Sequence, residues 1–250
     1  MNKRIEKLVQ KTISGEMYAT PVKTEYDRCD LFLSPVKMSC KRVCEYIKNQ
    51  EPPIAEESCF TGLITFDGSV EGDIFTRNGH RHFRTAFDNF YNKPVDNLLT
   101  FEWQHSAGDF GKIINRGISG IQNDIQKSME LHKNDEKAVE FLETQSDICN
   151  AVISWAEKCS EKAMALSKST ADSEYKRNLE RLSAALKKIP KNPAGNFYEA
   201  ILSLYVCYAL LPDSIGLIDR YLYPFYKADT ESGNLTREEA SEYLQELFLM

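Results

Sequence analysis

Residues 212–226, with the sequence PDSIGLIDRYLYPFY, place the strongest constraint on the fold of this chain. Asp213 and Ser214 precede a predicted tight turn at Gly216, and an aromatic-rich stretch interrupted by Pro224 follows it. Its aromatic members are Tyr221, Tyr223, Phe225 and Tyr226. Aromatic side chains at this density bury a large apolar area, so we expect the segment in a packed interior rather than in a surface loop.

The overall composition is that of a soluble globular protein. The chain has 250 residues, of which 42% are hydrophobic and 27% are charged, which is enough for one large domain or two small ones. The net charge of −6 argues against a nucleic-acid partner, which requires a basic face. No apolar run reaches the length of a membrane span, and the charged N-terminus MNKRIEKLVQK does not resemble a secretory signal.

The cysteines indicate a reducing compartment, and we therefore expect a cytoplasmic protein. There are 7 of them, an odd number at scattered spacings, which does not suit a disulfide framework. Cys40 and Cys44 have the first spacing of an iron–sulfur motif, C-x3-C-x2-C, but position 47 is Ile. Two thiols on one helical stripe are typical of small core residues, and no paired C-x2-C spacing indicates zinc. We therefore expect no metal site.

Hydrophobic periodicity predicts a mainly α protein with a few short strands. Helical patterns occupy residues 1–17, 24–49 (one or two helices), 109–132, 134–168, 171–188, 195–211 and 236–250. Glycines inside 109–132, among them Gly117, predict a break or a close approach. Thr236 and Glu239 have the spacing of a capping box, which fixes the start of the last helix. A hairpin is expected to turn at Asp67-Gly68.

A pair of histidines, His80 and His82, lies in the sequence FTRNGHRHF. Two imidazoles two residues apart could share one face of a strand and bind a metal. No carboxylate or thiol converges on them in the sequence, so we prefer a solvated or ligand-contacting loop.

Several blocks, in order, resemble motifs of the glycyl radical enzymes, the family of pyruvate formate-lyase and its dehydratase, lyase and decarboxylase relatives. Residues 212–226 resemble the block S-x-G-R-x-D-Q-Y-x-x-P-F-Y, and residues 192–210 resemble P-A-x-x-F-x-E-A-x-Q-x-x-x-F. Residues 103–125 resemble G-H-T-x-x-D-Y-x-K-V-L-x-x-G-L-x-G-I, and residues 227–250 resemble Y-x-x-D-x-x-x-G-x-L-T-x-E-E-A-x-E-L-L. Four motifs in the same order are far more specific than any one of them.

The resemblance implies a fold and a chemistry. The chain would be the N-terminal part of a pyruvate formate-lyase-like ten-stranded α/β barrel, with a divergent region at 1–100 and a helical region carrying the motifs at 101–250. Such enzymes hold a backbone glycyl radical that oxidises a cysteine to a thiyl radical, which attacks a small organic substrate or abstracts its hydrogen. The family further implies cleavage of a C–C, C–O, C–N or C–S bond, a radical-SAM activating enzyme as partner, no bound cofactor in this segment, and a homodimer at full length.

The two loops that carry the radical chemistry are expected beyond Met250. The only similar sequences here are Cys44-Glu45 and residues 116–120, which stand at the wrong places in the motif order, so neither is assigned. The last helical pattern runs to Met250 without a stop signal, which predicts an N-terminal piece of a longer enzyme. Such a piece would be inactive and poorly stable alone, with an uncovered apolar face on 236–250. The alternative is a non-catalytic helical binding or regulatory module, or a remnant, derived from the family.

Two residues are the candidates for substrate contact. His105 matches the histidine of G-H-T and is a possible acid/base, while Ser214 matches the serine of S-x-G-R, which lines the pocket in some members. The sequence departs from the family around both: Gln104 and Ser106 replace Gly and Thr, Leu217 replaces Arg and Arg220 replaces Gln. Structural roles remain open, because His105 could fix a helix start and Ser214 could be an ordinary turn hydroxyl.

Overall fold

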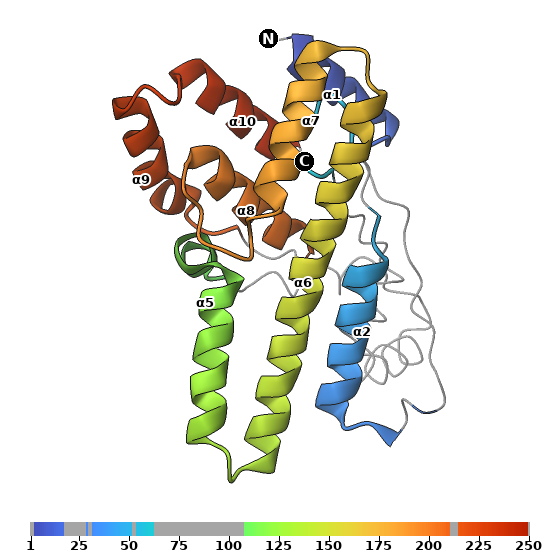
Figure 1. Cartoon of the computed structure of the whole chain (residues 1–250), viewed down its shortest axis with the longest axis vertical. Coiled ribbons are helices and arrows are strands. Elements are labelled where there is room, and N and C mark those ends of the chain that lie inside the picture. The colour runs from blue at the N-terminus through green and yellow to red at the C-terminus, as the bar shows by residue number, and fades with distance from the viewer. Residues whose placement is uncertain are drawn as a thin grey trace, which may run out of the picture.

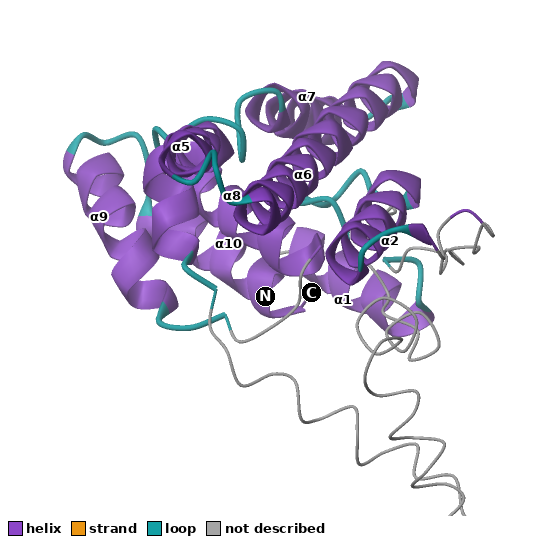
Figure 2. Ribbon diagram, turned by 90° about the horizontal axis from the view of Figure 1, so that it is seen from below, coloured by secondary structure: helices purple, strands orange, loops and turns teal. Residues whose placement is uncertain are grey.

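The computed structural model describes residues 3–17, 29, 32–51, 54–62, 108–210 and 215–249. Regular secondary structure in these residues is helical, and none of them lies in a strand (Figure 1, Figure 2). The helices are α1 Lys3–Ser14, α2 Pro35–Asn49, α5 Phe110–Leu131, α6 Glu136–Ser169, α7 Ser173–Leu186, α8 Phe197–Leu210, α9 Ile218–Glu231 and α10 Arg237–Leu249. The mainly helical prediction is confirmed, whereas the hairpin expected at Asp67-Gly68 lies outside the described residues.

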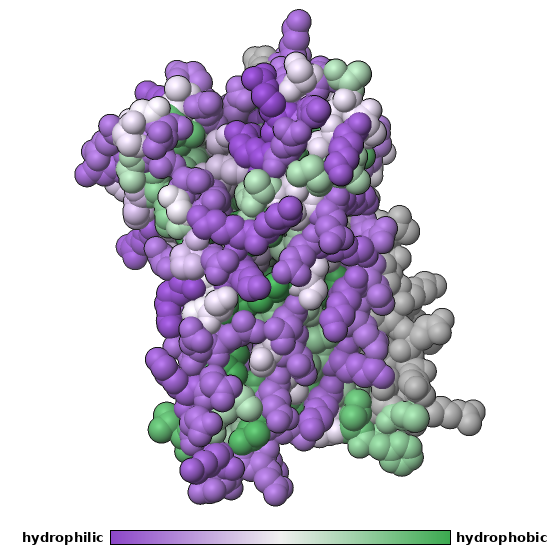
Figure 3. Space-filling view, in the orientation of Figure 1, coloured by the Kyte–Doolittle hydropathy of each residue, from purple (hydrophilic) through white to green (hydrophobic). Residues whose placement is uncertain are grey.

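Helix α6 runs along most of the long axis of the molecule, and other helices pack on both of its halves (Figure 1). Helix α7 folds back against one half, while α5 and α2 flank the other half (Figure 1). Hydrophilic residues cover most of the face seen in Figure 3, and apolar residues gather along the seam between α5 and α6. No helix in the described ranges is both long enough and apolar enough to cross a bilayer.

Acidic and hydroxyl side chains start most of these helices by local capping. Asp109, Asp135 and Asp172 each accept hydrogen bonds from backbone N–H groups in the first turn that follows. Thr236 and Glu239 form the predicted capping box: Thr236 Oγ1 accepts from the Glu239 N–H at 3.1 Å, and the Glu239 carboxylate accepts from the Thr236 N–H at 2.8 Å. These contacts explain why the helix starts could be located in the sequence.

The core is organised around α8, whose side chains are apolar on nearly every face. Of its 14 residues, only Glu199 and Tyr208 are not buried. Helices α5, α6, α9 and α10 all contact it. A helix that is apolar all round must be enclosed by other elements, so α8 fixes the positions of its neighbours.

Helix α5 has a kink at Gly117, as the glycines in its sequence predict. Gly117 has φ 65° and ψ 169°, a combination that is open essentially to glycine alone. The kink frees two backbone N–H groups, and those of Ile118 and Ser119 donate to the carbonyls of Pro190 and Lys191 at 2.8 and 2.9 Å. The kink therefore fastens the loop before α8 to the side of α5.

The aromatic stretch departs from the prediction in two ways. Helix α9 continues through Pro224, so the expected interruption is wrong. A proline inside a helix removes one backbone hydrogen bond, and Leu222 is the buried residue of this helix. The aromatic rings are also less buried than expected, because Tyr223 is 60% exposed and Tyr226 is half-buried.

One side of α10 is buried in the core, and the other side lines an open groove. Ala240, Tyr243 and Leu247 are buried, and α10 packs against α1 and α8, so the expectation of an uncovered face is wrong for this side. Leu244 and Phe248 instead line an apolar groove of about 650 Å³ between α1, α9 and α10. Phe248 is 72% exposed.

Replacing Gly117 by alanine should lower the free energy of unfolding by at least about 2 kcal/mol, because the backbone conformation is strained for any L side chain. The new Cβ would also lie 2.5 Å from the Asn192 carbonyl carbon and the Lys191 oxygen. Gly233→Ala is the control: it too has a positive φ, of 74°, but no atom lies within 4 Å of the added Cβ. Urea denaturation of the two variants and the parent measures the difference, and equal losses would contradict the steric argument.

Candidate functional site

The residues predicted to contact substrate, His105 and Ser214, lie outside the described residues, as do His80 and His82. The structure nevertheless describes what borders them. Asp109 caps α5 four residues after His105, and Gly216 adopts φ 68° two residues after Ser214. This positive φ is compatible with the predicted tight turn, whose first residues lie outside the described ones. The substrate contacts themselves stay predictions.

Cys40 and Cys44 are core residues, as predicted. Both are buried on α2, and their sulfur atoms lie 3.8 Å apart. Cys40 Sγ also donates to the Thr144 carbonyl at 3.3 Å. Burial raises the pKa of Cys44 to about 12, so both thiols are held as neutral apolar-like groups at the centre of the α2–α6 contact.

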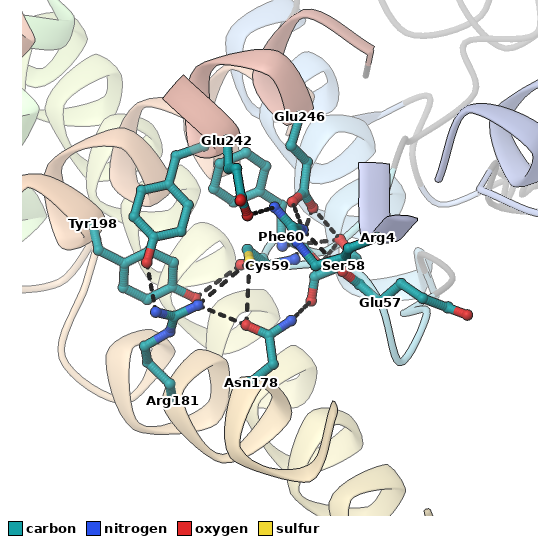
Figure 4. Close-up of polar contacts among 11 residues, drawn as sticks. Arg4, Glu57, Ser58, Cys59, Phe60, Asn178, Arg181, Tyr198, Glu242 and Glu246 are labelled. Carbon is teal, nitrogen blue, oxygen red and sulfur yellow. Dashed lines mark hydrogen bonds and ion pairs between the residues drawn. The ribbon is translucent and has the colours of Figure 1, made fainter. Parts of the chain in front are cut away.

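A buried polar cluster joins the two ends of the described chain (Figure 4). Its centre is the ion pair between Arg4 of α1 and Glu246 of α10, with Nη1 and Oε2 2.5 Å apart. Glu246 is fully buried, and its other oxygen accepts from the Cys59 N–H at 2.7 Å and the Ser58 hydroxyl at 2.6 Å. Arg4 also donates to the Glu57 carbonyl at 2.9 Å. Residues 57–59 are therefore clamped between α1 and α10.

The second half of the cluster lies on α7 and α8 (Figure 4). Asn178 donates to the Ser58 carbonyl at 2.8 Å and accepts from Arg181 at 2.7 Å. The Arg181 guanidinium lies over the ring of Tyr198, 4.5 Å from its centroid, and donates to the hydroxyl of Tyr243 at 2.5 Å. These contacts hold the guanidinium in one place through stacking and hydrogen bonding together.

The Cys59 thiol at the centre of this cluster is not suited to nucleophilic chemistry. Burial, reinforced by the charge of Glu246, raises its pKa to about 12 despite the two nearby arginines. Because the thiolate is the reactive form, such a thiol is inert near neutral pH. Its contacts to Asn178 Oδ1 at 3.2 Å and Arg181 Nη2 at 3.4 Å make it part of the packing. Among the described residues, no group of three or more His, Cys, Asp or Glu side chains is placed to hold a metal.

Two polar cavities open beside the cluster. One, of about 420 Å³, is lined by α7 residues including Arg177 and Arg181 and by Glu242 of α10. The other, of about 540 Å³, shares Arg181 and Tyr243 with it and extends toward Asn196. The Arg181 side chain therefore lines both cavities.

The sequence analysis missed this cluster, although one signal for it exists. Glu246 falls on the apolar stripe of its helix, between Tyr243 and Leu247, and Arg4 stands directly before Ile5 on the buried face of α1. A charged residue on an apolar stripe requires a buried partner of opposite charge. Which partner it finds depends on tertiary packing, since 242 positions separate the two residues.

The fold of the chain is similar to parts of larger solved structures. Its whole length superposes with a TM-score of 0.76 on a structure determined for 1,2-propanediol dehydration in Roseburia inulinivorans, at 20% identity. The B12-independent glycerol dehydratase of Clostridium butyricum gives the same TM-score at 16% identity, and the chain covers 39% of each structure.

Sequence comparison then identifies the family. The model described as "Pyruvate formate lyase-like" matches residues 95–250, so the chain belongs to the pyruvate formate lyase-like family. The isethionate sulfite-lyase of Bilophila wadsworthia is 30% identical over 161 residues, which are 58% of this chain. The 4-hydroxyphenylacetate decarboxylase glycyl radical subunit of Clostridium scatologenes is 30% identical over 112 residues, 42% of this chain. The matches cover only 19% and 12% of these relatives.

Replacing Glu246 by alanine should cost about 3–5 kcal/mol of unfolding free energy, because it leaves the Arg4 charge buried without its main partner. Glu231→Ala is the matched control, since Glu231 pairs with Lys227 at 3.8 Å on the surface and should change stability far less. Chemical denaturation followed by tryptophan fluorescence measures both. A loss for Glu246→Ala no larger than that of the control would show that the cluster does not hold α1 to α10.

Proposed function

We propose that this chain is the N-terminal part of a glycyl radical enzyme that cleaves a bond in a small organic substrate. The observation that carries this proposal is the 30% identity to an isethionate sulfite-lyase over 161 residues. The name of this relative states that it cleaves such a bond. The matching region also contains the four motif blocks at 103–250. The family's ten-stranded barrel would be completed by polypeptide outside these 250 residues.

The proposed reaction is carbon–sulfur bond cleavage with release of sulfite from a small hydroxyalkanesulfonate. Four isethionate sulfite-lyases from four organisms match this chain at 27–30% identity. A trans-4-hydroxy-L-proline dehydratase of Clostridioides difficile matches at 23% and an indoleacetate decarboxylase at 27%. Cleavage of a C–O or C–C bond is therefore the next alternative within the same radical chemistry.

The described residues of this chain are suited to building the fold of the enzyme and not to carrying its radical. The sequence that resembles a glycine loop, residues 116–120, lies within α5, and its Gly117 is packed against the backbone of Asn192. Cys44, which precedes a glutamate, is buried in α2 with its pKa raised to about 12 by burial. The catalytic cysteine and the radical glycine would therefore come from elsewhere in the enzyme.

His105 and Ser214 are the proposed substrate contacts of this chain, with His105 as hydrogen-bond or proton-transfer partner and Ser214 as an orienting hydroxyl. Both stand in the blocks that resemble the family most closely. A radical-SAM activating enzyme would install the glycyl radical, and the complete enzyme would be a homodimer without a bound cofactor in this segment.

A non-catalytic binding module is the second candidate. It is favoured by the cysteine environments, because the thiols at positions 40, 44, 59, 159 and 207 are buried and the thiol at position 149 is partly buried. The seventh, Cys29, is exposed. A thiyl radical forms when a thiol loses its hydrogen atom, and a thiol enclosed in the core cannot meet a substrate.

The test of the proposal is anaerobic activation of the protein encoded by the complete reading frame, with a radical-SAM activating enzyme and isethionate. We expect a glycyl radical signal in electron paramagnetic resonance and release of sulfite. The 250-residue chain treated in parallel should give neither. A stop codon directly after Met250, or a longer protein that forms no radical, would favour the binding module. A radical with release of a different product would retain the family chemistry and replace the substrate.

In the activated enzyme, His105→Ala should leave radical formation intact and lower turnover by about two orders of magnitude or more, the scale of a lost general acid/base. His132→Ala is the matched control, because His132 is exposed at the end of α5 and should leave turnover unchanged. Radical yield and product formation are measured on the same samples. Unchanged turnover in the His105 variant would assign that residue to fixing the start of α5.

A further inference from the structure

The apolar groove between α1, α9 and α10 offers a surface for apolar contact. Its volume is about 650 Å³, and Ile5 of α1 and Leu222 of α9, both buried, are among the residues that line it. The charged residues of its lining are Asp219 and Arg237, one of each sign. The charges of the lining are therefore balanced, and an occupant of this groove is held by apolar packing rather than by ionic attraction.

Two aromatic side chains that line the groove are exposed. Phe248 of α10 is 72% exposed and Tyr223 of α9 is 60% exposed. Aromatic side chains bury a large apolar area when they are covered, and a contiguous exposed apolar patch marks an interaction site. The groove therefore has the character of an interface that lacks its other half.

The walls of the groove are held in place by the buried polar cluster. Arg4 and Glu246 join α1 to α10 with Nη1 and Oε2 2.5 Å apart. Each stands next to a residue of the groove lining, Arg4 before Ile5 and Glu246 after Gln245. Because these walls are fixed in advance, an occupant does not have to order them, and less of its binding energy is lost.

The end of α10 lies at this groove. Leu249 is the last residue of the helix and is itself part of the groove lining. In the longer enzyme proposed above the polypeptide continues after Met250, so its next residues start at the edge of the groove. The chain covers 39% of each of the two solved structures on which it superposes, so most of such a fold lies outside it.

We propose that the groove is the docking site of the polypeptide that directly follows Met250 in the longer enzyme, and that this segment covers Tyr223 and Phe248 with apolar side chains. The inference rests on the proposed function, in which this chain is the N-terminal part of that enzyme. A segment tethered at the edge of its site has an effective concentration on the order of millimolar. It therefore occupies the groove ahead of a second copy of the chain in dilute solution.

The test places a cysteine in the groove and measures how fast a maleimide modifies it. Ser241→Cys and Gln245→Cys put a thiol at two exposed positions that line the groove. In the protein encoded by the complete reading frame, modification should be slower by about tenfold or more than in the 250-residue chain, because the docked segment covers both positions. This protection should not change with protein concentration, because the contact is intramolecular.

Ser169→Cys is the matched control, because Ser169 is exposed at the end of α6 and does not line the groove. It should react at similar rates in the two proteins. Within the longer protein, the groove positions should therefore react more slowly than the control position. Mass spectrometry of the modified peptides assigns each rate to its position, since the parent already has an exposed thiol at Cys29.

Equal rates at the groove positions in the two proteins, or equal protection at Ser169→Cys, would overturn the proposal. Protection in the 250-residue chain that increases with its concentration would assign the groove to a second copy instead. A reading frame that stops at Met250 would remove the proposed occupant. A longer protein that protects the groove but forms no glycyl radical would retain this inference and remove the proposed function, and a radical with an unprotected groove would do the reverse.

Discussion

The requirement to enclose α8 determines most of the observed architecture. Its side chains are apolar on nearly every face, so no single neighbour can remove them from water. Other helices therefore pack around it, and hydrophilic residues cover most of the face seen in Figure 3. Segments without helical structure contribute too: Phe60 stacks on Tyr205 of α8 with ring centroids 5.1 Å apart, and the Tyr205 hydroxyl donates to the Gly62 carbonyl.

Features that depend on neighbours in the sequence could be predicted, and features that depend on distant partners could not. The capping box of Thr236 and Glu239 and the break at Gly117 are set by local backbone chemistry, so both were predictable. Pro224 was misjudged because the sequence shows the local cost of a proline in a helix and not the contacts that the helix makes in the folded chain. The buried polar cluster was missed because its partners are distant in the sequence. Arg4 and Glu246 meet only in the folded chain.

The fold extends past the region in which the family model detects similarity. That model begins at residue 95, yet residues 57–62 are bonded firmly into helices that it covers. Most of these bonds use backbone atoms of the earlier segment: the carbonyls of Ser58, Cys59 and Gly62 and the N–H of Cys59. Backbone groups are common to nearly all residues, so such contacts place weak demands on side-chain identity. A chain can therefore keep this docking while its N-terminal sequence diverges.

The buried cluster specifies position more than it adds stability. A buried ion pair loses its hydration, and apolar residues of the same shape often stabilise a protein equally well. The hydrogen bonds of the cluster are directional, so they constrain the relative position of the two helices more narrowly than apolar contacts do. Glu246 receives the Arg4 guanidinium, the Ser58 hydroxyl and the Cys59 N–H together. Moving the Glu246 carboxylate out of this position would leave these buried donors unpaired, which is costly. The cluster thus sets how α10 lies against α1, and with it the width of the apolar groove between them.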